Sequence, residues 1–262
     1  MQRSFSTNAI VVSVKPSGEN NSSVTLVTPE KGIVYSTLYG GPKSKMRSLV
    51  SLWNSGVIYL YENPEKNQIK ISDFDVKNYH PSFSQNLYKM YAASLAAEIV
   101  LKTRCAGSNE ASWNLFSGFL DGLELSSEEQ GRVGLVRFLW RYLELLGIQP
   151  DAGECGYCGK SFLNGEFATG EKTYYNNLEN NFTCRECSEN LSPDSRQNLR
   201  MFPINAEAVR YLAAISALTP AQVRRMQISE ESYNQMKNIV FFLIENSIET
   251  KLNTIETGMG IL

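Results

Sequence analysis

Residues 23–40 read SVTLVTPEKGIVYSTLYG, and this stretch decides how the first third of the chain folds. Two runs of β-branched and aromatic residues, 23–28 and 32–39, alternate in part with polar residues, as strands with one buried face do. The PEKG sequence between them, at residues 29–32, is typical of a turn. The stretch therefore predicts two short strands separated by a turn.

Three similar runs flank this stretch: IVVSV at 10–14, VSLWNSGVIYLY at 50–61 and QIKISDF at 68–74. Clusters of turn-prone residues separate the runs from one another. Five short strands in so compact a stretch suit a small closed barrel, and we expect one of the OB type.

From about Ser82 the apolar spacing becomes helical. Ser126 and Glu129 match a capping box that opens one helix, and Gly147 ends it. Further helices are expected after residue 205, with Thr219 and Ser229 as caps. The apolar positions expected to define the first helix are Leu87, Met90, Tyr91, Leu95 and Ile99.

The order of these segments predicts an α+β multidomain protein. We expect an OB-type barrel at residues 1–79 and a helical domain built from residues 80–150 and 193–262. Residues 151–192 form an insert that contains four of the five cysteines.

Those four cysteines form two Cys-x-x-Cys pairs, Cys155/Cys158 and Cys184/Cys187, with 25 residues between the pairs. Two tight knuckles joined by a hairpin bring four sulfurs around one ion. Four protein ligands leave no open position, so we expect one structural Zn²⁺. A thioredoxin-like redox pair and disulfides are the alternatives. The N-terminus does not resemble a signal peptide, which favours a reducing cytoplasm and a metal.

The distribution of charged residues along the chain favours a polyanion site away from the cysteines. Residues 155–187 carry three Lys or Arg against four Glu, whereas residues 1–80 carry nine against six. A surface that repels phosphate is a poor nucleic-acid reader. A nucleic-acid site is therefore expected in the N-terminal third, the alternative being that this excess of three positive charges is an ordinary fluctuation of composition.

No catalytic constellation is apparent in the sequence. His80 is the single histidine, and no triad partner is evident for it. Cys105 is expected to be a buried inert thiol, and Asp73 and Asp75 to be solvated at a strand end. Phosphate-binding loops and dinucleotide fingerprints are missing, so we expect a protein that is not an enzyme.

Two stretches, residues 23–56 and VRFLWRYLELLGIQPDAGECGYCG at 136–159, resemble the two signatures of the bacterial recombination mediator family RecO. The resemblance implies DNA repair in the cytoplasm, at the nucleoid, in the RecFOR pathway. RecO proteins bind single- and double-stranded DNA, anneal complementary strands and, with RecR, help load RecA onto DNA covered by single-stranded-DNA-binding protein (SSB). They also bind the acidic C-terminal tail of SSB through the helical region. Zinc occurs in many members, and none needs a nucleotide cofactor.

The family's basic loop after the third strand has fewer positive charges here, because its paired arginines are missing from residues 39–47. Fewer phosphate contacts weaken the expected DNA affinity. The alternative function is therefore an adaptor that docks SSB and RecR and binds DNA weakly or not at all. Arg132, Arg137 and Arg141, on the helix of the second signature, are further basic candidates for DNA binding. The competing interpretation is an ordinary charge pattern on a helix surface. The DNA-binding candidates are Lys31, Lys43, Lys45, Arg47, Arg132, Arg137 and Arg141.

Aromatic side chains of OB barrels stack on the bases of single strands, next to a basic groove. The rings available here either serve that purpose or fill the barrel core. They are Tyr35, Tyr39, Trp53, Tyr59 and Tyr61.

Overall fold

The computed structural model describes residues 3–41, 44–165, 167–168, 170–191, 201–248 and 250–262. The chain divides into two compact units: unit 1 is Met1–Gly134 with Thr250–Leu262, and unit 2 is Leu135–Glu249. The finer division at residues 79, 150 and 192 stays a prediction. Within the described ranges, no helix has both the length and the apolar character that a membrane span requires.

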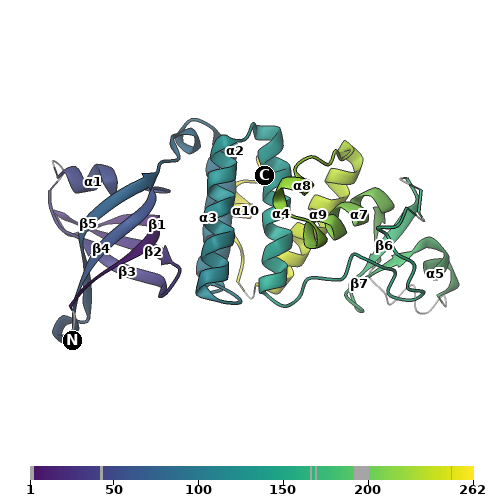
Figure 1. Ribbon diagram of the computed structural model, residues 1–262, viewed down its shortest axis with the longest axis horizontal. Coiled ribbons are helices and arrows are strands. Elements are labelled where there is room, and N and C mark those ends of the chain that lie inside the picture. The colour runs from purple at the N-terminus through teal and green to yellow at the C-terminus, as the bar shows by residue number, and fades with distance from the viewer. Residues whose placement is uncertain (1–2, 42–43, 166, 169, 192–200, 249) are drawn as a thin grey trace. The chain divides into compact units, whose positions relative to one another are not determined.

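Five strands of unit 1 close into a barrel in the order β1-β2-β3-β5-β4 (Figure 1). Strands β3 and β5 are parallel, and the other neighbours are antiparallel. This strand order confirms the OB-type barrel. The strands are β1 (Ser4–Ser17), β2 (Asn21–Thr28), β3 (Gly32–Leu38), β4 (Ser55–Asn63) and β5 (Gln68–Asn78).

Alternate residues of each strand point into the barrel, as the period of two predicts. The expected hairpin stretch supplies Val24 and Leu26 from β2 and Val34 and Leu38 from β3. Because their neighbours Thr25, Tyr35 and Thr37 point outward, one face of the β2–β3 pair is left for contacts outside the core.

Strand β4 begins five residues later than the sequence pattern predicted. A short helix α1 (Lys45–Leu49) and a turn occupy the space before Ser55. Trp53 adopts a left-handed backbone conformation, with φ of 71°. Its N–H donates to the carbonyl of Val11 at 2.8 Å, so the turn is bonded to β1 and cannot extend β4.

The helices of unit 1 follow the barrel: α2 (Leu87–Lys102), α3 (Asn109–Leu125), the start of α4 (Glu128–Leu145), and α10 (Asn253–Thr257). The capping box of α4 lies one residue later than expected. Ser127 Oγ accepts the N–H of Gln130, and Gln130 Oε1 accepts the N–H of Ser127, each at 3.2 Å. The Ser126 hydroxyl instead donates to the carbonyl of Gly122.

Helix α2 buries the expected residues Leu95 and Ile99, but the first turns of the helix differ from the prediction. Leu87 and Met90 are exposed, whereas Lys89 is buried. The Lys89 ammonium donates to Ser82 Oγ at 3.1 Å and to the Glu124 carbonyl at 3.0 Å. These bonds satisfy the charged end, so a lysine can occupy a buried position outside the predicted apolar face.

His80 joins the barrel to the helices of unit 1. Its Nδ1 lies 2.7 Å from the carbonyl oxygen of Trp53, and its Nε2 lies 3.0 Å from Asp121 Oδ1. The ring stacks on Phe83 and is buried. The residue therefore has a structural position between the barrel and α3.

Unit 2 contains a three-stranded sheet in the order β7-β6-β8. Strands β6 and β7 form the hairpin expected between the cysteine pairs, and β8 follows the second pair in the sequence. Thr219 and Ser229 precede helices as predicted. The elements are β6 (Lys172–Asn176), β7 (Asn181–Cys184), α5 (Arg185–Asn190), β8 (Met201–Asn205), α7 (Ala206–Ala217), α8 (Pro220–Val223) and α9 (Glu230–Ser247).

Candidate metal centre and nucleic-acid interface

Two knuckles bring the four cysteines together, as the spacing predicted. In the first knuckle, the N–H of Gly159 donates to the carbonyl of Cys155 at 2.9 Å. In the second, Cys184 ends β7 and caps α5, and Cys187 lies in the first turn of that helix. The ligand atoms of the four cysteines all lie within 4.8 Å of one another.

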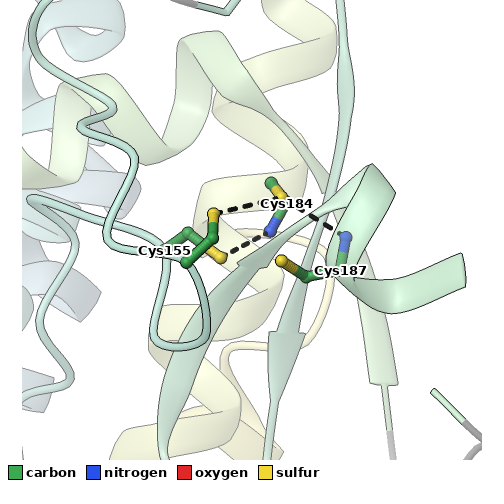
Figure 2. A group of neighbouring side chains, drawn as sticks. Cys155, Cys184 and Cys187 are labelled. Atoms are coloured by element: carbon green, nitrogen blue, oxygen red, sulfur yellow. Dashed lines mark hydrogen bonds between the residues drawn. The ribbon is translucent and has the colours of Figure 1, made fainter. Parts of the chain in front are cut away.

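One hydrogen bond between the knuckles and one within the second knuckle hold the sulfurs in place (Figure 2). The N–H of Cys184 donates to Cys155 Sγ at 3.3 Å, and the N–H of Cys187 donates to Cys184 Sγ at 3.5 Å. Burial works to raise the pKa of Cys155. Backbone N–H groups, chiefly that of Cys184, outweigh burial and lower this pKa to about 7. Burial instead raises the pKa of Cys184 and of Cys187, so of these three thiols Cys155 alone loses its proton easily, as a metal ligand must.

Gly156 allows the first knuckle to lie against β7. Its N–H donates to the carbonyl of Phe182 at 2.9 Å. A Cβ at this position would lie 2.4 Å from Asn181 Nδ2, so a side chain does not fit. The four thiols, two of them buried, form a donor set that could hold one metal ion.

The basic candidates of the barrel lie in two places. Lys45 is exposed at the start of α1, and Arg47 Nε donates to the Gly40 carbonyl at 3.1 Å, while Lys43 lies outside the described residues. Lys31 lies at the opposite end of β3, about 20 Å away by the length of that strand. Its ammonium lies 3.8 Å from the centre of the Phe5 ring.

The aromatic candidates separate into core and surface. Trp53 is 8% exposed, so it belongs to the interior. Tyr35 is 69% exposed and Tyr39 and Tyr59 are more than 40% exposed, so these rings do not fill the barrel. The positions of Tyr35 and Tyr59 on strands could be read from the sequence, but the exposure of each ring could not.

The three arginines of α4 have different surroundings. Arg132 belongs to unit 1, where it donates to Glu128 Oε1 at 2.8 Å and lies 4.4 Å from the centre of the Tyr88 ring. Arg137 and Arg141 belong to unit 2 and are half-buried. Among the three, only Arg132 forms an ion pair with a residue four positions away on the helix surface, which is the ordinary charge pattern considered as the alternative to DNA binding.

Arg137, Arg141 and Arg224 form a cluster of like charges in unit 2. Burial lowers the pKa of Arg137 and of Arg141, and repulsion from Arg224 lowers both further. Tyr211 also interacts with Arg137 and Arg141, and burial raises its pKa. No local pattern indicated Arg224, because more than 80 residues separate it from the other two.

The chain belongs to the class of proteins that combine an OB-type barrel with helices and a four-cysteine cluster. The model of the family described as "Recombination protein O C terminal" matches residues 84–255. The chain is 27% identical to the DNA repair protein RecO of Thermodesulfovibrio yellowstonii, over 95% of this chain and 93% of that protein. It is also 27% identical to the RecO proteins of Acaryochloris marina and Synechocystis, over 59% of this chain in each case. Those two matches span 53% and 58% of the relatives.

The chain therefore belongs to the RecO family of DNA repair and recombination proteins.

Proposed function

We propose that the chain is a non-enzymatic recombination mediator that binds single- and double-stranded DNA through its barrel. The observation that carries the proposal is the closed OB-type barrel with the basic loop before and within α1, in a chain of the RecO family. Lys45 and Arg47 provide a sequence-independent phosphate track, with Lys43 of the same loop as a further candidate. Annealing follows when the track screens the backbones of two complementary strands at once.

Charge reversal tests the track. The triple change Lys43→Glu, Lys45→Glu and Arg47→Glu should abolish the binding of labelled oligonucleotides at about 50 mM salt. The matched control reverses Lys160 and Lys172 of the cysteine module, where phosphate binding is not expected, and should bind as the wild type does. Unchanged affinity in a folded triple variant would show that the track lies elsewhere.

The metal in this proposal is one structural Zn²⁺ held by Cys155, Cys158, Cys184 and Cys187. Four thiolates prefer a soft, tetrahedral ion, and they leave no position for a substrate. The ion stabilises unit 2 and makes no direct contact with DNA. Metal analysis of the purified protein should find one zinc per chain.

A second candidate function, partner docking, is favoured by the arginine cluster of unit 2. Three cations, two of them half-buried, repel one another, so a carboxylate ligand relieves repulsion as it binds. The acidic C-terminal tail of SSB has the required charge. In the same function, RecR completes the assembly that loads RecA.

Arg224 is exposed, and it can therefore be changed without disturbing the core. The Arg224→Glu variant should bind a fluorescent SSB-tail peptide at least about tenfold more weakly than the wild type, because one charge-assisted contact becomes a repulsion. Arg225→Glu, at the adjacent exposed position, is the matched control. Equal losses in both variants would indicate a non-specific charge effect and would count against the cluster.

A further inference from the structure

A groove of about 400 Å³ opens on the outer side of the barrel. Ile33 and Tyr35 of β3 form one wall. The other wall comes from the end of β4, the short turn η1 (Pro64–Lys66) and the start of β5. The groove therefore lies between β3 and the β4–β5 connection, which is one of the places where OB barrels take oligonucleotides.

The ring of Tyr35 is available to a ligand. Tyr35 pairs with Thr25 across β2 and β3 and points outward between the buried residues Val34 and Ser36. Within the described part of the chain, no other ring or cation is found against it. Tyr39 differs, because its hydroxyl oxygen accepts a bond from Gln68 Nε2 at 2.8 Å and Lys70 lies 4.8 Å from its ring centre.

The polar lining of the groove suits a base better than a phosphate. Asn63 and Asn67 contribute amides, which offer both donors and acceptors, as base edges do, and Gln68, whose Nε2 is bonded to Tyr39, contributes a carbonyl oxygen. The charges of the lining, Lys31 and Glu62, lie 3.7 Å apart and offset each other. A phosphate would find no net positive charge at the centre of the groove.

Cations lie outside the groove centre. Lys66 is exposed in the turn η1, and Lys70 lies on β5 beyond the groove. A backbone that crosses the groove can place its phosphates near these ammonium groups while a base enters between them. The arrangement therefore separates base contacts from phosphate contacts.

We propose that this groove binds one unstacked base of single-stranded DNA on the ring of Tyr35. The inference rests on the proposed DNA-binding function and adds to it a preference for single strands over duplex DNA. Bases of a duplex are already paired and stacked, so they cannot reach the ring. Duplex DNA uses the phosphate track alone, and single strands use the track and the groove.

The test compares Tyr35→Leu with two other variants. Tyr35→Phe keeps the ring, and Tyr79→Leu removes a half-exposed ring that does not line the groove. The probes are a labelled oligothymidylate of about 16 nucleotides, the upper site size of one OB barrel, and a duplex of the same length. Each is titrated by fluorescence anisotropy in low salt.

Tyr35→Leu should raise the Kd for oligothymidylate about tenfold or more and leave the duplex Kd within about twofold. Tyr35→Phe and Tyr79→Leu should match the wild type on both probes. An unchanged single-strand Kd in Tyr35→Leu, or equal losses on both probes, overturns the groove assignment while the wild type still binds DNA. A wild type that binds neither probe overturns the DNA-binding function itself.

Discussion

Removing the metal from the four-cysteine cluster should destabilise unit 2 and leave unit 1 folded. All four ligands belong to Leu135–Glu249, whereas the barrel belongs to unit 1. The perturbation is either a chelator or the change Cys155→Ala. The matched control is Cys105→Ala, which removes a buried thiol of unit 1 whose pKa is raised by burial.

The magnitude follows from linkage between metal binding and folding. A ligand present at about 1,000 times its Kd contributes about 4 kcal/mol to the folded state. Unit 2 spans 115 residues, so an unfolding entropy of about 2.1 cal/mol/K per residue amounts to roughly 0.24 kcal/mol/K. Removing the ion should therefore lower the Tm of unit 2 by about 17 °C.

Differential scanning calorimetry, with metal content measured on the same samples, checks this expectation. One transition should move down after chelation, and the transition of unit 1 should stay in place. The Cys105→Ala variant should keep its metal and its response to the chelator. If the metal is removed and both transitions are unchanged, the cluster does not stabilise unit 2 and the structural role is refuted.

Three further predictions concern unit 1. Ser127→Ala removes the cap of α4 and should lower the free energy of unfolding by about 1 kcal/mol in urea denaturation; no loss would show that the cap bond is dispensable. Gly32→Ala places a Cβ 2.4 Å from Asn109 Oδ1 at a residue with φ of 64°, so stability should fall by more than about 1 kcal/mol, and adding Asn109→Ala should restore part of it. For Glu98, burial works to raise the pKa, but bonds from the N–H groups that open α10 and from Lys102 lower it overall. Its contribution is therefore present above the ordinary carboxyl pKa of about 4.3 and is lost as pH falls through the lower folded value. Glu98→Gln should flatten the acid limb of the stability curve, and an unaltered limb would contradict this assignment.

Local patterns in the sequence were enough for the parts of the fold that depend on nearby residues. The period of two predicted the five strands, because a barrel strand has one buried face and neighbouring residues alternate between faces. The spacing of Cys155, Cys158, Cys184 and Cys187 predicted the cluster, because two knuckles and a hairpin are enough to close it. The family resemblance, carried by residues 23–56 and 136–159, is confirmed by the family model over residues 84–255 and by a RecO relative that matches 95% of the chain.

Only the tertiary structure decided which side chains of similar pattern are buried and which face solvent. Lys89 is buried and Met90 is exposed, because Glu124 and Ser82 satisfy the ammonium from elsewhere in the fold. Tyr35 is exposed and Trp53 is buried, although both lie in strand-like sequence.

The candidate sites divide in the same way. The barrel groove forms only when distant segments pack together, and so does the electrostatic interaction between Arg224 and Arg137. Periodicity and motif spacing report on neighbours along the chain, so they predicted the barrel and the cysteine cluster. Contacts between residues far apart in sequence depend on how the chain closes, and those contacts determine what each surface can bind.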